Sequence, residues 1–359
     1  MAKSSYYYNI EDDIEKYPDA WCYIVVGGRN TGKTYGVLKS CKVHNRVFTF
    51  VKRTQEDVQI LCAGGAGQGN GKDYDLSPFK AINRDIGCNV RALSINKGIG
   101  GFWECDGDGA HGSPIGYITA LSVVNKVKGF DLSDSDWMIF DEFIPQPWER
   151  VSRKEGEQIL DLYKTISRDR EHRGRRPLKL IALANATKLS NPLMNILEVT
   201  DVVTRMKEYR EPLHYIADRG ILIHLLDDNK SFREKESQSA IYRAMKDTRW
   251  GAMALENDFA YDDTSNIVKM SIKGMRPLYS IIYKGKTYIL YAGNGTKYFT
   301  DSPTNKDIPV YNLDLENDQK RFYIERVIDL RSDCIDGYVK FKYYTLYDLV
   351  INYKSFYKV

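Results

Sequence analysis

The residues with the clearest chemical potential lie in one short run near the start of the chain. Residues 27–34 read Gly-Gly-Arg-Asn-Thr-Gly-Lys-Thr, a complete G-x-x-x-x-G-K-[ST] pattern. The glycines allow the backbone to curl so that successive N–H groups face a phosphate, and the helix that follows adds its positive N-terminal end. Lys33 is expected to bridge the β- and γ-phosphates, and Thr34 to ligate Mg²⁺ through its hydroxyl. The predicted phosphate-binding residues are Gly27, Gly28, Arg29, Asn30, Thr31, Gly32, Lys33 and Thr34.

A carboxylate pair, Asp141-Glu142, directly follows the apolar run 137–140. An acid at the end of a buried strand forms the second half of such a site. Asp141 would hold the Mg²⁺ shell, and Glu142 is placed to polarise the attacking water as general base. A Glu after that Asp is typical of ATP-hydrolysing machines, the ASCE type of P-loop NTPase, and no NKxD-type guanine-reading motif occurs. We therefore predict an ATPase with ATP and Mg²⁺ as cofactors.

A polar residue, Asn185, follows another apolar run, 178–184. ATPases of this class place a polar sensor after the corresponding strand, where it can report the γ-phosphate to the next domain. A turn or helix-capping role is the alternative interpretation of Asn185.

Alternating strands and helices are needed to position these residues. Four apolar stretches predict buried strands: 23–26, 46–51, 137–140 and 178–184. Helical spacing predicts helices over 33–40 and over 156–170, the second with an apolar stripe. Apolar strands that alternate with helices indicate an α/β fold built on a parallel sheet with crossover connections.

Beyond about residue 265 the pattern changes to antiparallel strands. Residues 278–283 and 287–291 flank a Lys-Gly-Lys turn, and before them 231–246 is typical of a charged helix. A chain of 359 residues is long enough for roughly two domains. We expect a P-loop ATPase domain at 1–204, a small linker subdomain at 205–250 and an α+β C-terminal domain at 251–359.

Composition excludes several classes of protein. Hydrophobic residues make up 43% and charged residues 28% of the chain, which excludes a disordered or collagen-like chain. No apolar run approaches the ~18 residues of a membrane span, and the first residues lack a secretory signal, so we expect a cytoplasmic protein with no membrane contact. The net charge is only +4, but Lys164–Lys179 holds seven basic residues against two acidic ones.

Several runs besides the nucleotide motifs carry a more specific signal. Together with those motifs they are Val25–Arg29, Gly32–Tyr35, Phe50–Arg53, Leu121–Val123, Ile139–Ile144, Ser167–Glu171, Leu183–Ala186, Leu255–Phe259 and Ser280–Gly285. In this order, over nearly the whole chain, they resemble the DNA-packaging ATPases (encapsidation proteins) of phi29-like tailed phages, a terminase-like family. The Phe-Asp-Glu-Phe-Ile run and the Arg-x-Arg-Glu segment are much more specific than the Walker motifs.

The resemblance implies a ring-forming ATPase, expected to be a homopentamer, at the portal vertex of an empty prohead in the host cytoplasm. It would pump double-stranded viral DNA into the prohead, with ring size and any need for a scaffold RNA left open. It also implies residues that act on a neighbouring subunit's nucleotide. Arg168 aligns with the family's arginine finger, with Arg170 as the alternative, and Lys128 with a second basic residue that reaches the neighbour. Arg29 matches an arginine found in the P-loop of viral packaging ATPases.

Other interpretations of these positions stay open. Residues 164–179 could instead form a solvated basic face or a phosphate-tracking DNA contact. The glycine-rich run 64–71 and the turn 173–177 depart from the family. Candidate pore residues that contact DNA, or members of an ordinary charged loop, are Arg150, Arg153 and Lys154. The alternative functions are a helicase or translocase unrelated to capsids, and a non-catalytic ATP-dependent DNA clamp.

The resemblance also implies an RNase H-like C-terminal domain, and we expect this domain to have lost nuclease activity. Two-metal cleavage needs clustered carboxylates, of which the first strand normally supplies one. The candidate first strand, 279–283, has no acid, and the cationic turn 284–286 follows it. The remaining acids fall in stretches predicted to be loops: Asp314, Glu316, Asp318, Asp333 and Asp336. We therefore predict a vestigial domain that contacts DNA or the portal.

Overall fold

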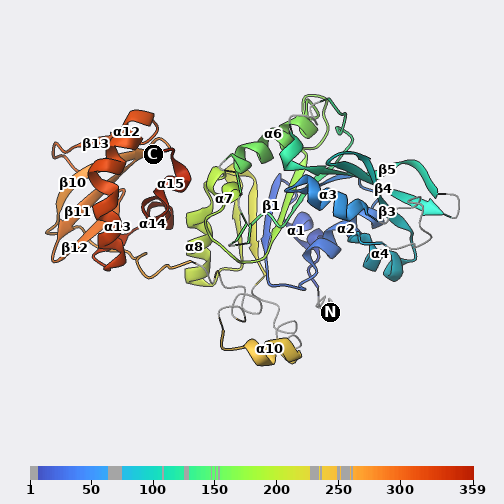
Figure 1. Ribbon diagram of the computed structural model, residues 1–359, viewed down its shortest axis with the longest axis horizontal. Helices are drawn as coiled ribbons and strands as arrows, with labels where there is room; N and C mark the ends of the chain where they lie inside the picture. Colours follow the sequence, from blue (N-terminus) through green and yellow to red (C-terminus); the bar gives the residue numbers. More distant parts are fainter. Residues whose placement is uncertain are drawn as a thin grey trace. The chain divides into compact units, whose positions relative to one another are not determined.

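Figure 1 shows a computed structural model of the chain, which divides into two compact units. The first unit combines Met1–Ile196 with Met206–Tyr261, and the second combines Leu197–Arg205 with Asp262–Val359. The residues that the structure describes are 7–63, 75–106, 109–124, 129–146, 148–149, 151–152, 154–226, 234, 237–248, 251, 259 and 262–359.

The first unit is an α/β fold whose described residues form one nine-stranded sheet. Its strands are β1 Cys22–Val26, β2 Phe48–Lys52, β3 Val90–Asn96, β4 Ile99–Asp106, β5 Gly109–Ala120, β6 Trp137–Asp141, β7 Lys179–Ala184, β8 Leu213–Ile216 and β9 Ile221–Leu225. Its helices are α1 Ile10–Lys16, α2 Lys33–Val43, α3 Gln55–Cys62, α4 Phe79–Ile86, α6 Glu155–Ser167, α7 Pro192–Ile196 and α10 Ala240–Met245, with 3₁₀ turns at Leu121–Val123 and Ala217–Arg219. Helix α8, Thr200–Tyr209, has residues in both units.

The strands of this sheet are ordered β3-β4-β5-β2-β6-β7-β1-β9-β8. The strands from β5 to β9 in that order run parallel, whereas β3, β4 and β8 at the edges pair antiparallel. Strand β7 lies between β1 and β6, with Val26 opposite Ala184 and Asp141 opposite Leu183. The carboxyl ends of β1, β7 and β6 therefore meet at one edge of the sheet.

The connections of the sheet place helices on both of its faces. The crossover from β1 through α2 leads towards β2, while the crossover from β6 through α6 leads the opposite way across the sheet, to β7. Because such crossovers are right-handed, α2 and α6 lie on opposite faces. In open α/β sheets, ligands bind outside the carboxyl ends of the strands, where connections diverge in this way.

Buried apolar side chains explain why these segments become central strands. All five residues of β1 are buried, and β7 is buried over its last five residues. Nearer the β5 side, the rings of Phe48, Phe79 and Phe102 pack with centroids 5.0 to 6.3 Å apart. Gly116 is required beside them, because a Cβ there would lie 2.5 Å from the Phe48 ring.

The four strands predicted from apolar runs are confirmed as β1, β2, β6 and β7. The helix predicted over 156–170 ends earlier, at Ser167, because Arg168 leaves the helix with a φ of 45°. Within the segment expected to be a linker, 205–250, the short runs 213–216 and 221–225 form β8 and β9 of the large sheet, and β9 pairs parallel with β1. In the described part of the helix predicted over 231–246, the helical residues are Glu234 and those of α10.

The second unit is an α+β fold, and its described residues form a five-stranded sheet ordered β13-β10-β11-β12-β14. These strands are β10 Arg276–Tyr283, β11 Lys286–Gly293, β12 Thr296–Thr300, β13 Val310–Asn312 and β14 Val339–Phe341. Strands β10 and β11 are antiparallel, as predicted, and β12 extends this antiparallel arrangement, while β13 and β14 add parallel to β10 and β12. The helices are α12 Glu316–Phe322, a π turn Tyr323–Val327, α13 Ile328–Ile335, α14 Tyr344–Ile351 and α15 Tyr353–Phe356.

The acidic residues of the second unit are only partly in loops, contrary to the prediction. Three of them are helical: Glu316 and Asp318 in α12, and Asp333 in α13. Asp314 accepts hydrogen bonds from the backbone N–H groups of Lys284 and Gly285, at 3.0 and 3.1 Å, and Asp333 pairs with Lys297. Asp314 thus fastens the cationic turn between β10 and β11.

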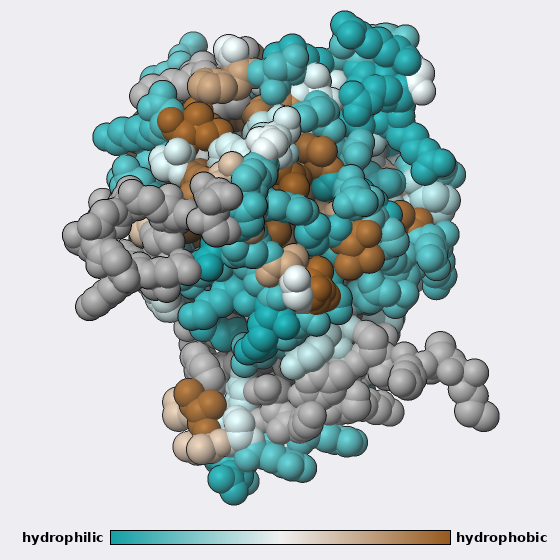
Figure 2. All heavy atoms as spheres, turned by 90° about the vertical axis from the view of Figure 1, so that its right-hand side faces the viewer, coloured by the Kyte–Doolittle hydropathy of each residue, from teal (hydrophilic) through white to brown (hydrophobic). Residues whose placement is uncertain are grey.

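The surface of the described residues is mixed in polarity. Figure 2 shows the face at the right of Figure 1, where apolar side chains occur as small groups separated by hydrophilic ones. Among the described residues, none of the helices combines the length and the apolar character needed to cross a membrane.

Candidate nucleotide-binding site

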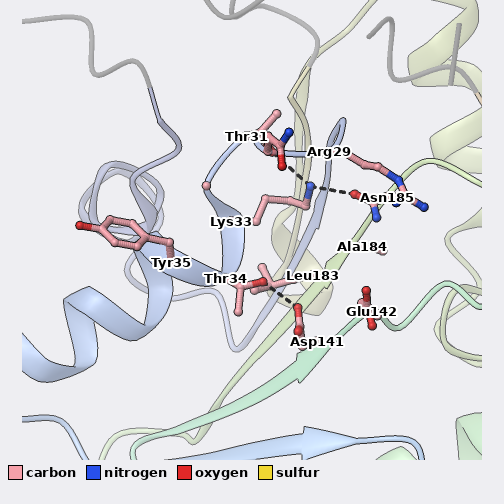
Figure 3. A pocket seen from close by; sticks show the side chains of 12 residues that line it. Arg29, Thr31, Lys33, Thr34, Tyr35, Asp141, Glu142, Leu183, Ala184 and Asn185 are labelled. Atoms are coloured by element: carbon pink, nitrogen blue, oxygen red, sulfur yellow. Dashed lines mark hydrogen bonds between the residues drawn. The ribbon is translucent and has the colours of Figure 1, made fainter. Parts of the chain in front are cut away.

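The predicted phosphate-binding loop joins the end of β1 to the start of α2 (Figure 3). It turns through two positive φ angles, 62° at Asn30 and 80° at Gly32. The hydroxyl of Thr31 donates to the Gly28 carbonyl at 3.0 Å, which closes the loop on itself. Gly32 also allows close packing, because a Cβ there would lie 2.9 Å from the Cβ of Tyr7. The local sequence therefore produces a tight loop at the carboxyl edge of the sheet.

Lys33, the first residue of α2, folds back over this loop. Its ammonium donates to the carbonyls of Gly27 and Gly28 at 3.1 and 2.7 Å, to Thr31 Oγ1 at 3.1 Å and to Asn185 Oδ1 at 3.3 Å. The structure thus brings the loop lysine and the predicted sensor together.

The charge of Lys33 is sensitive to its surroundings. Burial lowers its pKa to about 7, although Asp141 and Glu142 favour the charged form. A phosphate beside this ammonium would favour the charged form further, so phosphate binding would be coupled to proton uptake.

Asp141, the last residue of β6, faces the start of α2. The Thr34 hydroxyl donates to Asp141 Oδ1 at 2.8 Å, and the Lys52 ammonium lies 3.0 Å from Asp141 Oδ2. Burial alone would lower the pKa of Lys52, but Asp141 and Glu142 outweigh it and raise that pKa. A hydroxyl and a carboxylate at this separation suit Mg²⁺, which takes few protein ligands and completes its shell with phosphate and water oxygens. Thr34 and Asp141 therefore fit the predicted ion.

Glu142 follows in a left-handed backbone conformation, with φ 58°. Its side chain is 63% exposed, and its carboxylate lies 3.6 Å from the Lys52 ammonium. Figure 3 shows it on the same side of the loop as Arg29 and Asn185. This carboxylate is therefore accessible to water beside the phosphate-binding loop.

A single cavity of about 330 Å³ joins these side chains. Its lining residues are Arg29, Asn30, Thr31, Gly32, Lys33, Thr34, Tyr35, Asp141, Glu142, Leu183, Ala184 and Asn185. Two cationic and two anionic side chains thus border one space at the carboxyl edge, which is the composition that a magnesium-bound polyphosphate requires.

A second cavity, of about 870 Å³, adjoins the first and shares three of its lining residues, Asn30, Gly32 and Tyr35. Tyr7 and Tyr8 also line it, and the Tyr8 N–H donates to the Thr31 carbonyl at 3.0 Å. The Tyr35 side chain points away from the carboxylate pair (Figure 3). An aromatic-lined space therefore continues from the phosphate-binding loop.

Sequence reasoning assigned no role to four residues that the fold brings to the site: Lys52, Arg53, Tyr7 and Tyr8. Lys52 and Arg53 directly follow the predicted strand 46–51, and two cations at a strand end were a usable signal of a place in the site. The fold sets this strand, β2, beside β6, which ends at the acidic pair. The tyrosines could not be found in this way, since they lie about 20 residues before the loop and reach it only by folding.

Arg168 and Arg170 lie apart from this cavity and differ in exposure. The Arg168 side chain is 40% exposed, donates to the Phe130 carbonyl at 3.0 Å and lies 3.4 Å from Asp131. Arg170 is 4% exposed and bonds to the Ser135 carbonyl and to Asp136, the latter at 2.9 Å.

The position of Arg168 follows from the direction of α6. Asp136 precedes β6, so Arg170 packs at the amino edge of the sheet, opposite the carboxylate pair. Helix α6 has 13 residues and a length of about 20 Å at 1.5 Å per residue, with Arg168 at its far end. Arg168 is therefore remote from the nucleotide cavity of its own chain.

The remaining predicted residues are only partly described. Lys128, Arg150 and Arg153 lie outside the described residues. Lys154 is exposed and precedes α6, and its N–H donates to Ser152 Oγ at 3.2 Å.

The fold and the sites together define a mixed α/β protein with a large parallel sheet. Comparison with protein-family models matches residues 110–358 to the podovirus DNA encapsidation protein (Gp16) family. Because that match spans more than half of the chain, the chain belongs to this family.

Two curated relatives are DNA packaging proteins of Bacillus phages. The DNA packaging protein of Bacillus phage B103 is 26% identical over 270 residues, which cover 73% of this chain and 71% of the relative. The DNA packaging protein of Bacillus phage phi29 is 25% identical over 244 residues, which cover 64% of this chain and 68% of the relative.

Solved structures share the fold. A chain of the bacteriophage Phi-29 viral genome packaging motor assembly superposes with a TM-score of 0.65 at 22% identity, covering 98% of this chain and all of that one. A chain of the Phi-28 gp11 DNA packaging motor superposes with a TM-score of 0.61 at 18% identity, and the match covers 99% of this chain and 99% of that one.

Proposed function

We propose that this chain is an ATP-driven motor that translocates double-stranded viral DNA into a preformed phage prohead. The observation that carries the proposal is one cavity in which Lys33 and Thr34 meet the Asp141–Glu142 pair, in a member of the encapsidation family. The names of the relatives, DNA packaging proteins, support the same function. Contact with DNA would be largely independent of sequence, because a whole genome passes through.

In the proposed reaction, water attacks the γ-phosphorus of ATP while the bond from that phosphorus to the β,γ-bridging oxygen breaks, so that ADP leaves. The loop N–H groups and Lys33 bind the phosphates, and Thr34 and Asp141 would hold Mg²⁺. The ion, when bound, neutralises charge that develops on the phosphates. Glu142 accepts a proton from the attacking water, and Asn185 senses the γ-phosphate beside Lys33. The order of β1, β7 and β6 supports an ASCE-type P-loop ATPase.

The second cavity is the proposed site for the nucleoside part of ATP. It continues from the loop on the side away from the carboxylate pair, where the α-phosphate leads, and Tyr35 offers a ring for base stacking. Tyr35→Ala should weaken ATP binding roughly 5- to 150-fold, the range for loss of one aromatic–base stack. Binding of inorganic triphosphate should be unchanged, and Tyr35→Phe serves as control. Equal weakening of both ligands would contradict this assignment.

The proposed assembly is a homopentameric ring at the portal vertex, in the host cytoplasm. Arg168 would act on the nucleotide of a neighbouring subunit, with Lys128 as a second such residue. The exposure of Arg168, and its distance from the cavity of its own chain, favour it over the buried Arg170. Pore contacts by Arg150, Arg153 and Lys154, and a role for a scaffold RNA, stay open proposals.

The second unit is proposed to be a vestigial RNase H-like domain. Three antiparallel strands followed by a strand parallel to the first fit that family of folds, whereas β14 lies at the opposite edge, beside β12. Incubation of the whole protein with plasmid DNA and Mn²⁺ or Mg²⁺ tests the loss of cleavage. Metal-dependent nicking that disappears on Asp333→Asn would contradict it.

Purified proheads distinguish the main proposal from its alternatives. A packaging motor should show ATPase activity that depends on proheads and DNA. A helicase or translocase unrelated to capsids should hydrolyse ATP equally without proheads, and a non-catalytic clamp should show little steady-state turnover.

A further inference from the structure

Arg53, the residue after β2, occupies an unusual position between the catalytic edge and helix α6. Its side chain is 15% exposed, and its guanidinium contacts two carboxylates. Nε donates to Glu155 Oε2 at 2.9 Å and Nη2 to Glu155 Oε1 at 3.2 Å, while Nη1 donates to Glu149 at 3.1 Å. The side-on pair with Glu155 fixes the plane of the guanidinium, as two parallel charge-assisted hydrogen bonds do.

The same guanidinium also holds the backbone of the carboxylate pair. Nη2 donates to the carbonyl of Glu142 at 3.1 Å and to that of Phe143 at 3.2 Å. On the other side, the Phe143 N–H donates to the Leu183 carbonyl of β7 at 3.1 Å. The peptide that follows Glu142 is therefore fixed between Arg53 and β7.

This fixation matters because Glu142 has a φ of 58°. A non-glycine residue in that region costs on the order of 1 kcal/mol or more and persists only where its surroundings determine it. Without the two hydrogen bonds from Arg53, relaxation of this backbone would swing the carboxylate away from its present position beside the cavity.

Glu155 in turn fixes Arg53. Its side chain is 3% exposed at the start of α6, and burial raises the pKa of its carboxyl, an effect that the Arg53 contact opposes. A carboxylate this deeply buried needs a cation, and here that cation is aimed at the Glu142 carbonyl.

We propose that Arg53, held by Glu155, is a positioning residue for ATP hydrolysis that keeps the Glu142 backbone in the conformation from which its carboxylate meets the attacking water. The inference rests on the proposed role of Glu142. Lys52, its neighbour, differs because it contacts the carboxylates of Asp141 and Glu142 directly.

The test uses Arg53→Met/Glu155→Met, which removes both charges and so leaves no buried ion without a partner. Single-turnover hydrolysis by the full chain, assembled on proheads with DNA, is measured with and without Glu142→Gln. With Glu142 present, the hydrolysis rate should fall roughly 10- to 100-fold, as for a reacting group misplaced by about 1 Å, with little change in ATP affinity. In the Glu142→Gln background the same pair of changes should have no further effect, because Arg53 acts through Glu142.

Two further variants keep the result interpretable. Lys42→Met/Glu104→Met removes another ion pair of the same unit and should leave the rate unchanged. Arg53→Lys keeps the charge beside Glu155 but lacks the fork that reaches the carbonyls, so it should lower the rate while melting near the wild-type temperature.

Three outcomes would overturn the inference: an unchanged rate in both Arg53 variants, a loss of ATP affinity without a loss of rate, or an equal loss in both backgrounds. If Glu142→Gln alone kept the wild-type rate, the proposed function would lose its general base, and the inference would fail with it.

Discussion

The two ends of helix α6 prepare side chains for chemistry in opposite ways. At its start, Glu155 is buried and binds Arg53, which holds the backbone of Glu142 beside the cavity. At its end, Arg168 is 40% exposed, and its φ of 45° and ψ of −126° lie in a region that residues other than glycine rarely occupy. The Arg53–Glu155 pair, which is proposed to act within its own chain, is largely buried, whereas Arg168, which is proposed to act on a neighbour, stays accessible although it also contacts Phe130 and Asp131. The proposed ring makes this contrast testable.

The largest effect is expected at the exposed end. Arg168→Ala should lower ATP hydrolysis in assembled rings about 10³- to 10⁵-fold, because an arginine finger stabilises charge that develops on the transferred phosphoryl group. Steady-state ATPase assays with proheads measure the loss.

Mixed rings then test whether Arg168 acts between subunits. Arg168→Ala and Glu142→Gln subunits are each inactive, but some mixed interfaces pair an intact Glu142 with an intact Arg168, so partial activity should return. A lack of rescue in verified mixed rings would count against Arg168 as a residue that serves the neighbour.

Beside the start of α6, Glu142→Gln keeps the shape of the side chain but cannot accept a proton. Hydrolysis should fall at least ~10²-fold, the low end for a general base, while ATP binding persists. Calorimetric titration with ATP separates this outcome from that of Lys33→Ala, which should weaken binding itself. Near-normal turnover of Glu142→Gln would exclude it as the base.

The pH dependence of ATP affinity tests the role of Lys33 in the same cavity. Burial lowers the pKa of Lys33 to about 7 in the phosphate-free cavity, and a bound phosphate should raise this pKa. Below pH 7 the ammonium is charged in both states, so ATP affinity is flat. As pH rises through 7, the free protein loses a proton that binding must restore, and affinity should fall about 10-fold between pH 6 and pH 8.

Lys33→Arg is the matched control for this titration, because its side chain stays charged and leaves only the titration of the nucleotide itself. Affinity measured across pH in both proteins gives the difference. Wild-type affinity that changes no more than that of Lys33→Arg would contradict the assignment.

The smallest effect on the rate of ATP hydrolysis is expected for Arg170, whose buried guanidinium bonds to Ser135 and Asp136 of its own chain. Arg170→Met should lower the free energy of unfolding by about 1–3 kcal/mol, because the partners of a buried guanidinium lose their hydrogen bonds. Hydrolysis in assembled rings should change by less than about 3-fold, since Arg170 touches no reacting group. A loss as large as that of Arg168→Ala would remove the distinction between the two arginines.

The sequence predicted which residues meet at the edge of the proposed site, because these residues sit at the ends of apolar runs. Strands 23–26, 137–140 and 178–184 place Lys33, Asp141 and Asn185 at one edge once they pair in parallel, and short-range patterns suffice to find such strands. The order of those strands, with β7 between β1 and β6, follows from tertiary packing and was not predicted.

Contacts between distant segments could not be predicted from the sequence, because they too follow from tertiary packing. Arg53 and Glu155 are 102 residues apart, and neither position carries a pattern that reveals the pair. Strands β8 and β9 fall in the segment predicted to be a linker, because apolar runs of four or five residues beside a charged helix carry little periodic signal. Their place was decided by pairing with β1.

The most direct test of the central claim is DNA packaging itself, measured as the genome-length DNA that purified proheads protect from DNase. With ATP and Mg²⁺, the wild-type chain should give full protection, whereas Glu142→Gln should bind ATP and protect none. Equal protection by both proteins, or protection without ATP, would contradict the claim that hydrolysis at this cavity drives packaging.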